Sequence, residues 1–288
     1  MKRIINVLLG AVVIFTTACL EDDSKKPFDY TAVYFPHQKP LRTVTTQDST
    51  IKVGVVLGGK RDNKVNEYAY FSLAPELLDD QSMLLPSTHY KMDVDEDSLI
   101  KIPSGSFQGD FSMSFTADFY NDANAVDHYY ILPLKIDQYT TDSVLYGKHY
   151  TMIKVKYINE YHGTYYRKGA DGDEKYRSDS LVKNTTVDLT TSGTKKVILS
   201  KIGGPTAPFA DKMELTINED NSISAQLAAP NADLVISNFS GKVGETTGVI
   251  FESQIIYSFD YTFETNATRS VKDTLIFRDN GIRFETWD

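Results

Sequence analysis

Cysteine and tryptophan are the scarcest residues of this 288-residue sequence, which contains one of each. A single cysteine forms no intrachain disulfide and cannot supply the several thiolates of a structural zinc site. The chain must therefore fold without covalent cross-links. Once the cysteine is modified, no thiol is left to act as a nucleophile.

Motifs of the common enzyme classes are also missing. The five histidines are scattered without an H-E-x-x-H pair, and no glycine-rich phosphate loop occurs. The acidic loop at 93–98 lacks the central glycine and final glutamate of a calcium-binding EF-hand loop. We therefore expect a protein that is not an enzyme and that holds no metal or cofactor. Carboxylates are plentiful, so a hidden glycosidase pair is the alternative left open.

The sequence has one long apolar run, at 4–15, which is shorter than the ~20 residues that a membrane-spanning helix requires. Two basic residues precede this run, and small residues follow it directly before Cys19. This order is typical of a secretory signal, with the cysteine where a bacterial lipoprotein is cut and acylated. We predict a signal peptide at 1–18 and lipidation of Cys19, although a threonine replaces the usual leucine three residues earlier.

Charge is mostly of one sign, with 39 acidic against 30 basic residues and a net charge of −9. The net charge becomes −11 when Lys2 and Arg3 leave with the signal peptide. This balance argues against nucleic acid or an anionic lipid surface as a partner. Residues 19–30 are expected to form a lipidated acidic tether. The acids that follow Cys19 are similar to the export signal of bacterial surface lipoproteins, which predicts an outer-membrane protein facing the cell exterior; a solvated linker is the alternative.

Aromatic residues are abundant, with 18 tyrosines and 15 phenylalanines, and such residues favour β-strands. Polar and apolar residues alternate strictly at 111–119, which predicts one half-buried strand. A strand is also expected at 282–287, joined to the strand before it by a hairpin at Asn280-Gly281. One short helix is expected near 75–85.

The strands separate into two groups, because the alternating pattern breaks near Asn159-Glu160. We predict an all-β protein with an N-terminal antiparallel β-sandwich, immunoglobulin-like, over 31–158. An antiparallel sandwich or barrel-like domain is expected over 159–288.

Several segments carry a family resemblance. The sequences LLPSTHYKMDVDEDSLIKIP at 84–103, SGSFQG at 104–109 and YYILPLKI at 129–136 occur in order. They resemble the N-terminal domain of a two-domain Bacteroidetes surface lipoprotein family of formerly unknown function. YHGTYYRKG at 161–169 is similar to the start of its C-terminal domain. The resemblance implies glycan capture beside an outer-membrane importer complex of the starch-utilisation type, and it supplies no ligand residues.

Three aromatic residues are candidates for stacking on a sugar ring. Trp287 alternates with charged residues on one face of the last predicted strand, although it could instead pack at a sheet edge. Tyr165 and Tyr166 point to opposite sides of a strand, so at most one of them is expected to be free. The tyrosines and phenylalanines at 257–263 share a face that we interpret as core.

Two functional hypotheses follow. The first is a surface lipoprotein that binds an oligosaccharide or polysaccharide without catalysis, in support of a glycan uptake system. The second is a structural or adhesive surface lipoprotein that docks a protein partner. A narrow cluster of exposed aromatic residues would favour glycan, and a broad apolar patch would favour a protein.

Overall fold

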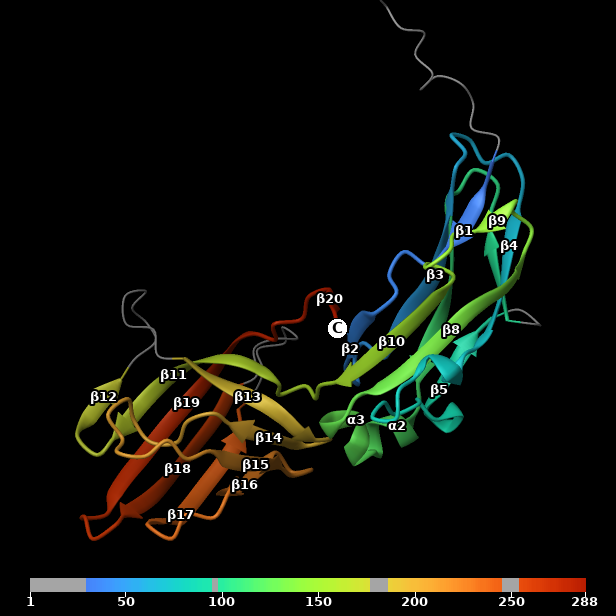
Figure 1. The fold of residues 1–288 in the computed structure, drawn as a ribbon. Helices are drawn as coiled ribbons and strands as arrows, with labels where there is room; N and C mark the ends of the chain where they lie inside the picture. Colours follow the sequence, from blue (N-terminus) through green and yellow to red (C-terminus); the bar gives the residue numbers. More distant parts are fainter. Residues whose placement is uncertain (1–29, 95–97, 177–185, 245–253) are drawn as a thin grey trace, which may run out of the picture.

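The computed structural model describes residues 30–94, 98–176, 186–244 and 254–288. The predicted signal peptide, Cys19 and most of the tether lie outside these residues. The chain forms two β lobes set at an angle, with the C-terminus on the inner side of that angle (Figure 1). The all-β prediction is confirmed.

The N-terminal lobe is a sandwich of two sheets. The five-stranded sheet runs, in spatial order, β5 (Tyr90–Asp93), β7 (Gln108–Phe115), β3 (Thr50–Gly58), β1 (Ala32–Tyr34), β9 (Ser143–Val144). The six-stranded sheet runs β20 (Glu285–Thr286), β2 (Pro40–Val44), β10 (Tyr150–Tyr157), β8 (Tyr130–Tyr139), β4 (Glu67–Leu73), β6 (Leu99–Ile102). Most neighbours are antiparallel, but β1 with β9 and β2 with β10 are parallel pairs.

The two sheets bury alternate side chains between them, as their period-two patterns require. The ring of Phe71 on β4 stacks on that of Phe111 on β7 with centroids 5.0 Å apart. Val33, Leu132 and Val155 are completely buried in the same cluster. This core is mostly apolar, although it also includes Tyr130 and Tyr157.

The C-terminal lobe is one curled sheet. In spatial order it runs β12 (Glu174–Tyr176), β11 (Gly163–Asp171), β13 (Thr186–Gly193), β14 (Lys196–Leu199), β15 (Met213–Ile217), β16 (Ser222–Leu227), β17 (Leu234–Val243), β18 (Gln254–Phe263), β19 (Arg269–Asp279). The additional pairing of β11 with β19 closes β11 and β13 to β19 into an eight-stranded barrel. Tyr257, Phe259 and Tyr261 point into it and are buried, as predicted for the aromatic face at 257–263.

The predicted strand at 111–119 is correct only in its first half. β7 ends at Phe115, and a short helix, α2 (Ala117–Asn121), follows it. The pairing of β7 with β3 ends at Ser114 and that with β5 at Phe115. The Thr116 N–H still donates to the His89 carbonyl at 3.0 Å, and the backbone then turns into the helix. The helix still buries Phe119, whose ring centroid lies 4.6 Å from that of Phe115.

Other helical structure is short. α3 (Ala123–Asp127) follows α2, with the Asp122 carboxylate accepting from the backbone N–H of Asn124 at its start. The helix predicted near 75–85 is only a single 3-10 turn, η2 (Pro75–Leu77), and a second turn, η3 (Ser87–His89), precedes β5.

The predicted hairpin at Asn280-Gly281 is wrong. Gly281 does adopt the left-handed conformation, with φ of 66°. However, β18 and β11 occupy the two edges of β19, so a following strand finds no free edge. The chain instead leaves the barrel, and only Glu285–Thr286 of the predicted strand at 282–287 is extended and paired, as β20 in the other lobe.

Candidate functional site

Residues 280–288, which we call the C-terminal strap, connect the barrel to the N-terminal sandwich. The strap runs from the end of β19 to the edge of the six-stranded sheet (Figure 1). There β20 pairs antiparallel with β2, with Thr286 opposite Pro40 and Glu285 opposite Leu41. The last residues of the sequence therefore contribute to a surface of the first domain.

Trp287 is anchored at this edge by two hydrogen bonds. Its indole Nε1–H donates to the Met152 carbonyl and its backbone N–H to the Lys39 carbonyl, both at 3.0 Å. The Nζ atoms of Lys39 and Lys154 lie 4.9 and 4.5 Å from the ring centroid. The side chain is partly exposed, so Trp287 lies at a sheet edge and also offers ring surface to solvent.

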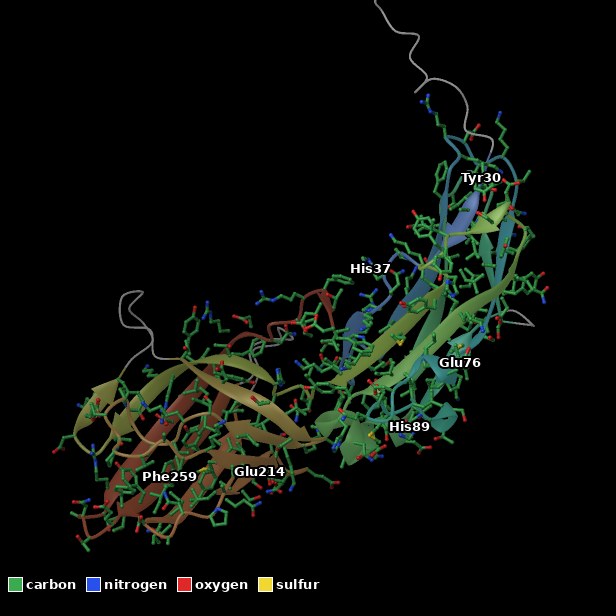
Figure 2. All side chains as sticks on the ribbon, viewed as in Figure 1. Tyr30, His37, Glu76, His89, Glu214 and Phe259 are labelled. Carbon is green, nitrogen blue, oxygen red and sulfur yellow. The ribbon has the colours of Figure 1, made fainter. Side chains whose placement is uncertain are left out.

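Phe284, three residues before Trp287, lies against a different pair of residues of the N-terminal sandwich. Its side chain is 53% exposed, and its centroid is 4.6 Å from the His37 ring and 5.1 Å from the Arg42 guanidinium carbon. Partial burial lowers the pKa of Arg42 but leaves it cationic at neutral pH. His37 extends from the N-terminal lobe on the side that faces the strap (Figure 2). A small pocket of about 50 Å³ adjoins it and is also lined by Lys52.

We call Trp287, Phe284, His37, Lys39, Arg42 and Lys154 the strap site. The six side chains supply aromatic faces and cationic hydrogen-bond donors, and Glu285 and Asp288 flank the tryptophan. Aromatic faces stack on the apolar faces of sugar rings, and donors at their rim bind hydroxyl or carboxylate oxygens. This arrangement suits binding of a polar, ring-containing ligand.

The other two predicted residues are not part of the strap site. Tyr165 is completely buried in the barrel, and its hydroxyl donates to the Tyr161 carbonyl at 2.9 Å. Burial also raises its pKa above the ordinary value. Tyr165 is therefore a core residue, and its assignment as a glycan-binding residue is corrected. Tyr166 points outward, half-buried, with the Arg278 guanidinium carbon 5.7 Å from its ring centroid.

The remaining strap-site residues were not predicted from the sequence. No local pattern in the sequence marks Phe284, His37, Lys39 or Arg42. They reach the tryptophan only because β2 accepts the end of the chain as its neighbour. Such a pairing between distant segments leaves no short motif.

Partly buried polar contacts hold the connector between the lobes against the barrel. The Asn159 amide donates to the carbonyls of Gly193 and Lys196 at 2.9 and 2.8 Å. His162 Nδ1 accepts from the backbone N–H of Thr191 at 3.1 Å. Burial lowers the pKa of His162 to about 4, so the ring is neutral at pH 7.

A cavity of about 180 Å³ lies at this junction, lined in part by His162, Asp48 and Ile282 of the strap. Among the residues with a described position, no group of three histidine, cysteine, aspartate or glutamate side chains could hold a metal ion. The described helices are all too short or too polar to cross a lipid bilayer.

Comparisons with known proteins identify the fold. A family model described as an N-terminal domain matches residues 27–143. A Bacteroides ovatus protein of unknown function is 21% identical, with 90% of this chain and 98% of that chain covered and a TM-score of 0.71. No curated protein matches the sequence.

Two further structures are more distant. A second Bacteroides ovatus protein of unknown function is 12% identical over 89% of this chain and 99% of that chain, with a TM-score of 0.44. An auxiliary nutrient binding protein from Bacteroides thetaiotaomicron is 13% identical over 82% of this chain and 89% of that chain, with a TM-score of 0.41. Only the first likeness is close enough to show a shared two-lobed fold.

Proposed function

We propose that this protein is a lipid-anchored surface protein of the Bacteroidetes that binds glycan at the strap site and performs no reaction on it. The observation that carries the proposal is that two aromatic side chains of the strap, Trp287 and Phe284, each lie against cationic side chains of the N-terminal sandwich. The lipoprotein-type start of the sequence supports the surface location, with Cys19 as the acylated residue. The neighbour that we propose for it is an outer-membrane uptake complex.

The form of the strap site favours a glycan over a protein partner. Its two aromatic residues lie close together in sequence and are surrounded by charged groups, whereas a protein-docking surface presents a contiguous apolar area. A shallow site buries only part of a sugar, so each contact is weak. Several copies on one membrane would bind a polysaccharide more tightly through multivalency.

The test is glycan binding by the full chain in detergent, measured by calorimetry across a panel of neutral and acidic oligosaccharides. Replacing Phe284 by Ala should weaken binding at least tenfold, because it removes the most exposed ring but neither of the strap's backbone contacts. Trp287→Ala should weaken binding further, because it also loosens the strap.

The control is Tyr146→Ala, which removes a 93% exposed aromatic side chain from the turn after β9, in the sandwich. The affinity of this control variant for each glycan should equal that of the wild type. If the Phe284 and Trp287 variants bind every glycan as the wild type does, the strap site is not the binding surface. If the wild type binds no glycan at millimolar concentration, the protein-docking hypothesis replaces this one.

A further inference from the structure

A second surface, on the outer face of the barrel, contains four lysines around an open groove of about 940 Å³. The groove lies over β11, β12, β17, β18 and β19, outside the strap site. The four side chains, exposed to solvent, are Lys168, Lys175, Lys242 and Lys272. We call this surface the lysine groove.

The strand register explains why these residues gather. One outward-facing row crosses four strands and has a lysine at each end; it reads Lys242, Ile256, Thr274, Lys168. Neighbouring strands lie about 4.8 Å apart, so the two end lysines are roughly 14 Å apart along the sheet. The next row reads Ser240, Ser258, Lys272, Ala170, Lys175. The floor between the lysines is therefore made of hydroxyl groups and small apolar side chains.

These lysines differ from many others in the chain. Lys60, Lys135, Lys195 and Lys196 each have a carboxylate within 4 Å. Within the described ranges, none of the four groove lysines has such a partner. Asp260 interacts electrostatically with Lys272, and that carboxylate also accepts hydrogen bonds from Asn238 and Ser270.

Among the described residues, these four lysines gather on one face without a salt bridge, in a chain whose net charge is −9. Like charges on neighbouring strands repel, so this arrangement costs stability unless a ligand neutralises it. An anionic ligand that spans the groove would gain charge-assisted hydrogen bonds from the lysines and further ones from Ser258 and Thr274.

We propose that the lysine groove binds a segment of an acidic polysaccharide, with carboxylate or sulfate groups on the lysines and sugar hydroxyls on the serine and threonine side chains. The choice of a saccharide over other polyanions rests on the proposed function. The inference that the ligand is anionic rests on the lysines alone and does not depend on the proposed function. Tyr166 lies opposite Ile276 at the end of the groove and offers a ring for stacking.

The test measures binding of chondroitin sulfate, polygalacturonate, neutral dextran and a single-stranded DNA oligonucleotide to the full chain in detergent. The groove variant is K168Q/K272Q. The matched control, K201Q/K212Q, removes two charges from the β14–β15 connection of the same barrel, outside the groove. We expect the groove variant to lose about a hundredfold in affinity for an acidic polysaccharide, since it removes two lysines and each charge-assisted hydrogen bond contributes roughly tenfold.

The control should bind like the wild type, and the wild-type affinity should fall as salt is added. Equal loss in both variants, no loss in the groove variant, or no binding of either acidic polysaccharide overturns the proposal. Equal affinity for the DNA oligonucleotide overturns the saccharide assignment.

The strap variant Phe284→Ala, measured with the same panel, separates this proposal from the proposed function. The loss of glycan affinity caused by Phe284→Ala should be the same whether or not the groove lysines are replaced. Glycan binding that needs Phe284 but not the lysines would refute the lysine groove alone, and the reverse result would refute the strap site alone.

Discussion

The barrel contains a buried ion pair whose disruption should be costly. Arg167 on β11 and Asp273 on β19 both point inward and are 0% and 3% exposed. The Arg167 Nε–H donates to Asp273 Oδ2 at 2.9 Å, and Nη2 donates to the same oxygen. The hydroxyls of Tyr257 and Tyr176 also donate to this carboxylate. Burial raises the pKa of both tyrosines well above the ordinary value, so both remain protonated donors.

The perturbation is Arg167→Met, which keeps a long apolar side chain and removes the positive charge. Breaking one partner of a buried ion pair typically costs about 3–5 kcal/mol, because the other charge is left uncompensated in the interior. The two tyrosine donors still stabilise the Asp273 carboxylate, so we expect about 3 kcal/mol. Asp273→Asn should cost a similar amount, because it leaves the guanidinium without its counter-charge.

The double variant R167M/D273N tests the physical reason. Both charges are absent from it, so it should be more stable than the sum of the two single effects predicts, by about 1–3 kcal/mol. The free energy of unfolding is best followed by hydrogen exchange in urea on peptides from β11 and β19, because two lobes need not unfold together. Peptides from β8 report on the other lobe and should be unchanged.

Two results would refute this reasoning. A loss below 1 kcal/mol in both single variants would show that the pair is hydrated or dispensable. Strict additivity in the double variant would show that Arg167 and Asp273 act through separate packing contacts and not through their charges.

Two further predictions concern a glycine and a histidine. Gly169→Ala would place a Cβ 2.1 Å from Asp273 Oδ1 and 2.2 Å from the Lys272 carbonyl, so urea-dependent exchange should show a barrel less stable by about 2–3 kcal/mol. Gly193→Ala, whose Cβ would meet nothing closer than 3.4 Å, should cost under half as much. The lowered pKa of His162, about 4, means that the unfolded chain takes up its proton first as the pH falls. The contribution of His162 to stability is fully present above pH ~6.5 and is lost towards pH 4, a decrease of about 2 kcal/mol after allowing for partial exposure. The variant His162→Gln, followed by thermal unfolding, should lose less stability over this pH range. If the variant loses as much stability as the wild type, His162 is not the cause.

Much of the architecture could be predicted from local patterns, because strand alternation reports directly on which side chains face a core. The aromatic face predicted at 257–263 is largely buried in the barrel, and the first half of the strand predicted at 111–119 is correct. The alternation of polar and apolar residues predicts a strand wrongly where a helical turn happens to continue the same pattern, as at 117–119. It also cannot show that an inward position holds a charged residue such as Arg167, since only the register brings Asp273 beside it.

The strap site shows the same limit more sharply. A hairpin at Asn280-Gly281 is the locally favoured outcome, and Gly281 does adopt the backbone conformation that such a turn uses. The competing factor is the closure of the barrel, which occupies both edges of β19 before the turn is reached. A sequence pattern does not show which sheet edges are free, so the partner of the final strand could not be predicted.

The two proposed surfaces depend on different amounts of the folded chain. The strap site needs the sandwich and a docked strap, because its residues come from β10, from β2 and the residues just before it, and from the C-terminus. The lysine groove needs only the register of five barrel strands. Detachment of the strap would therefore abolish the first surface and leave the second intact. A ligand bound at the strap site must in turn stabilise the docked strap, since it binds that state preferentially.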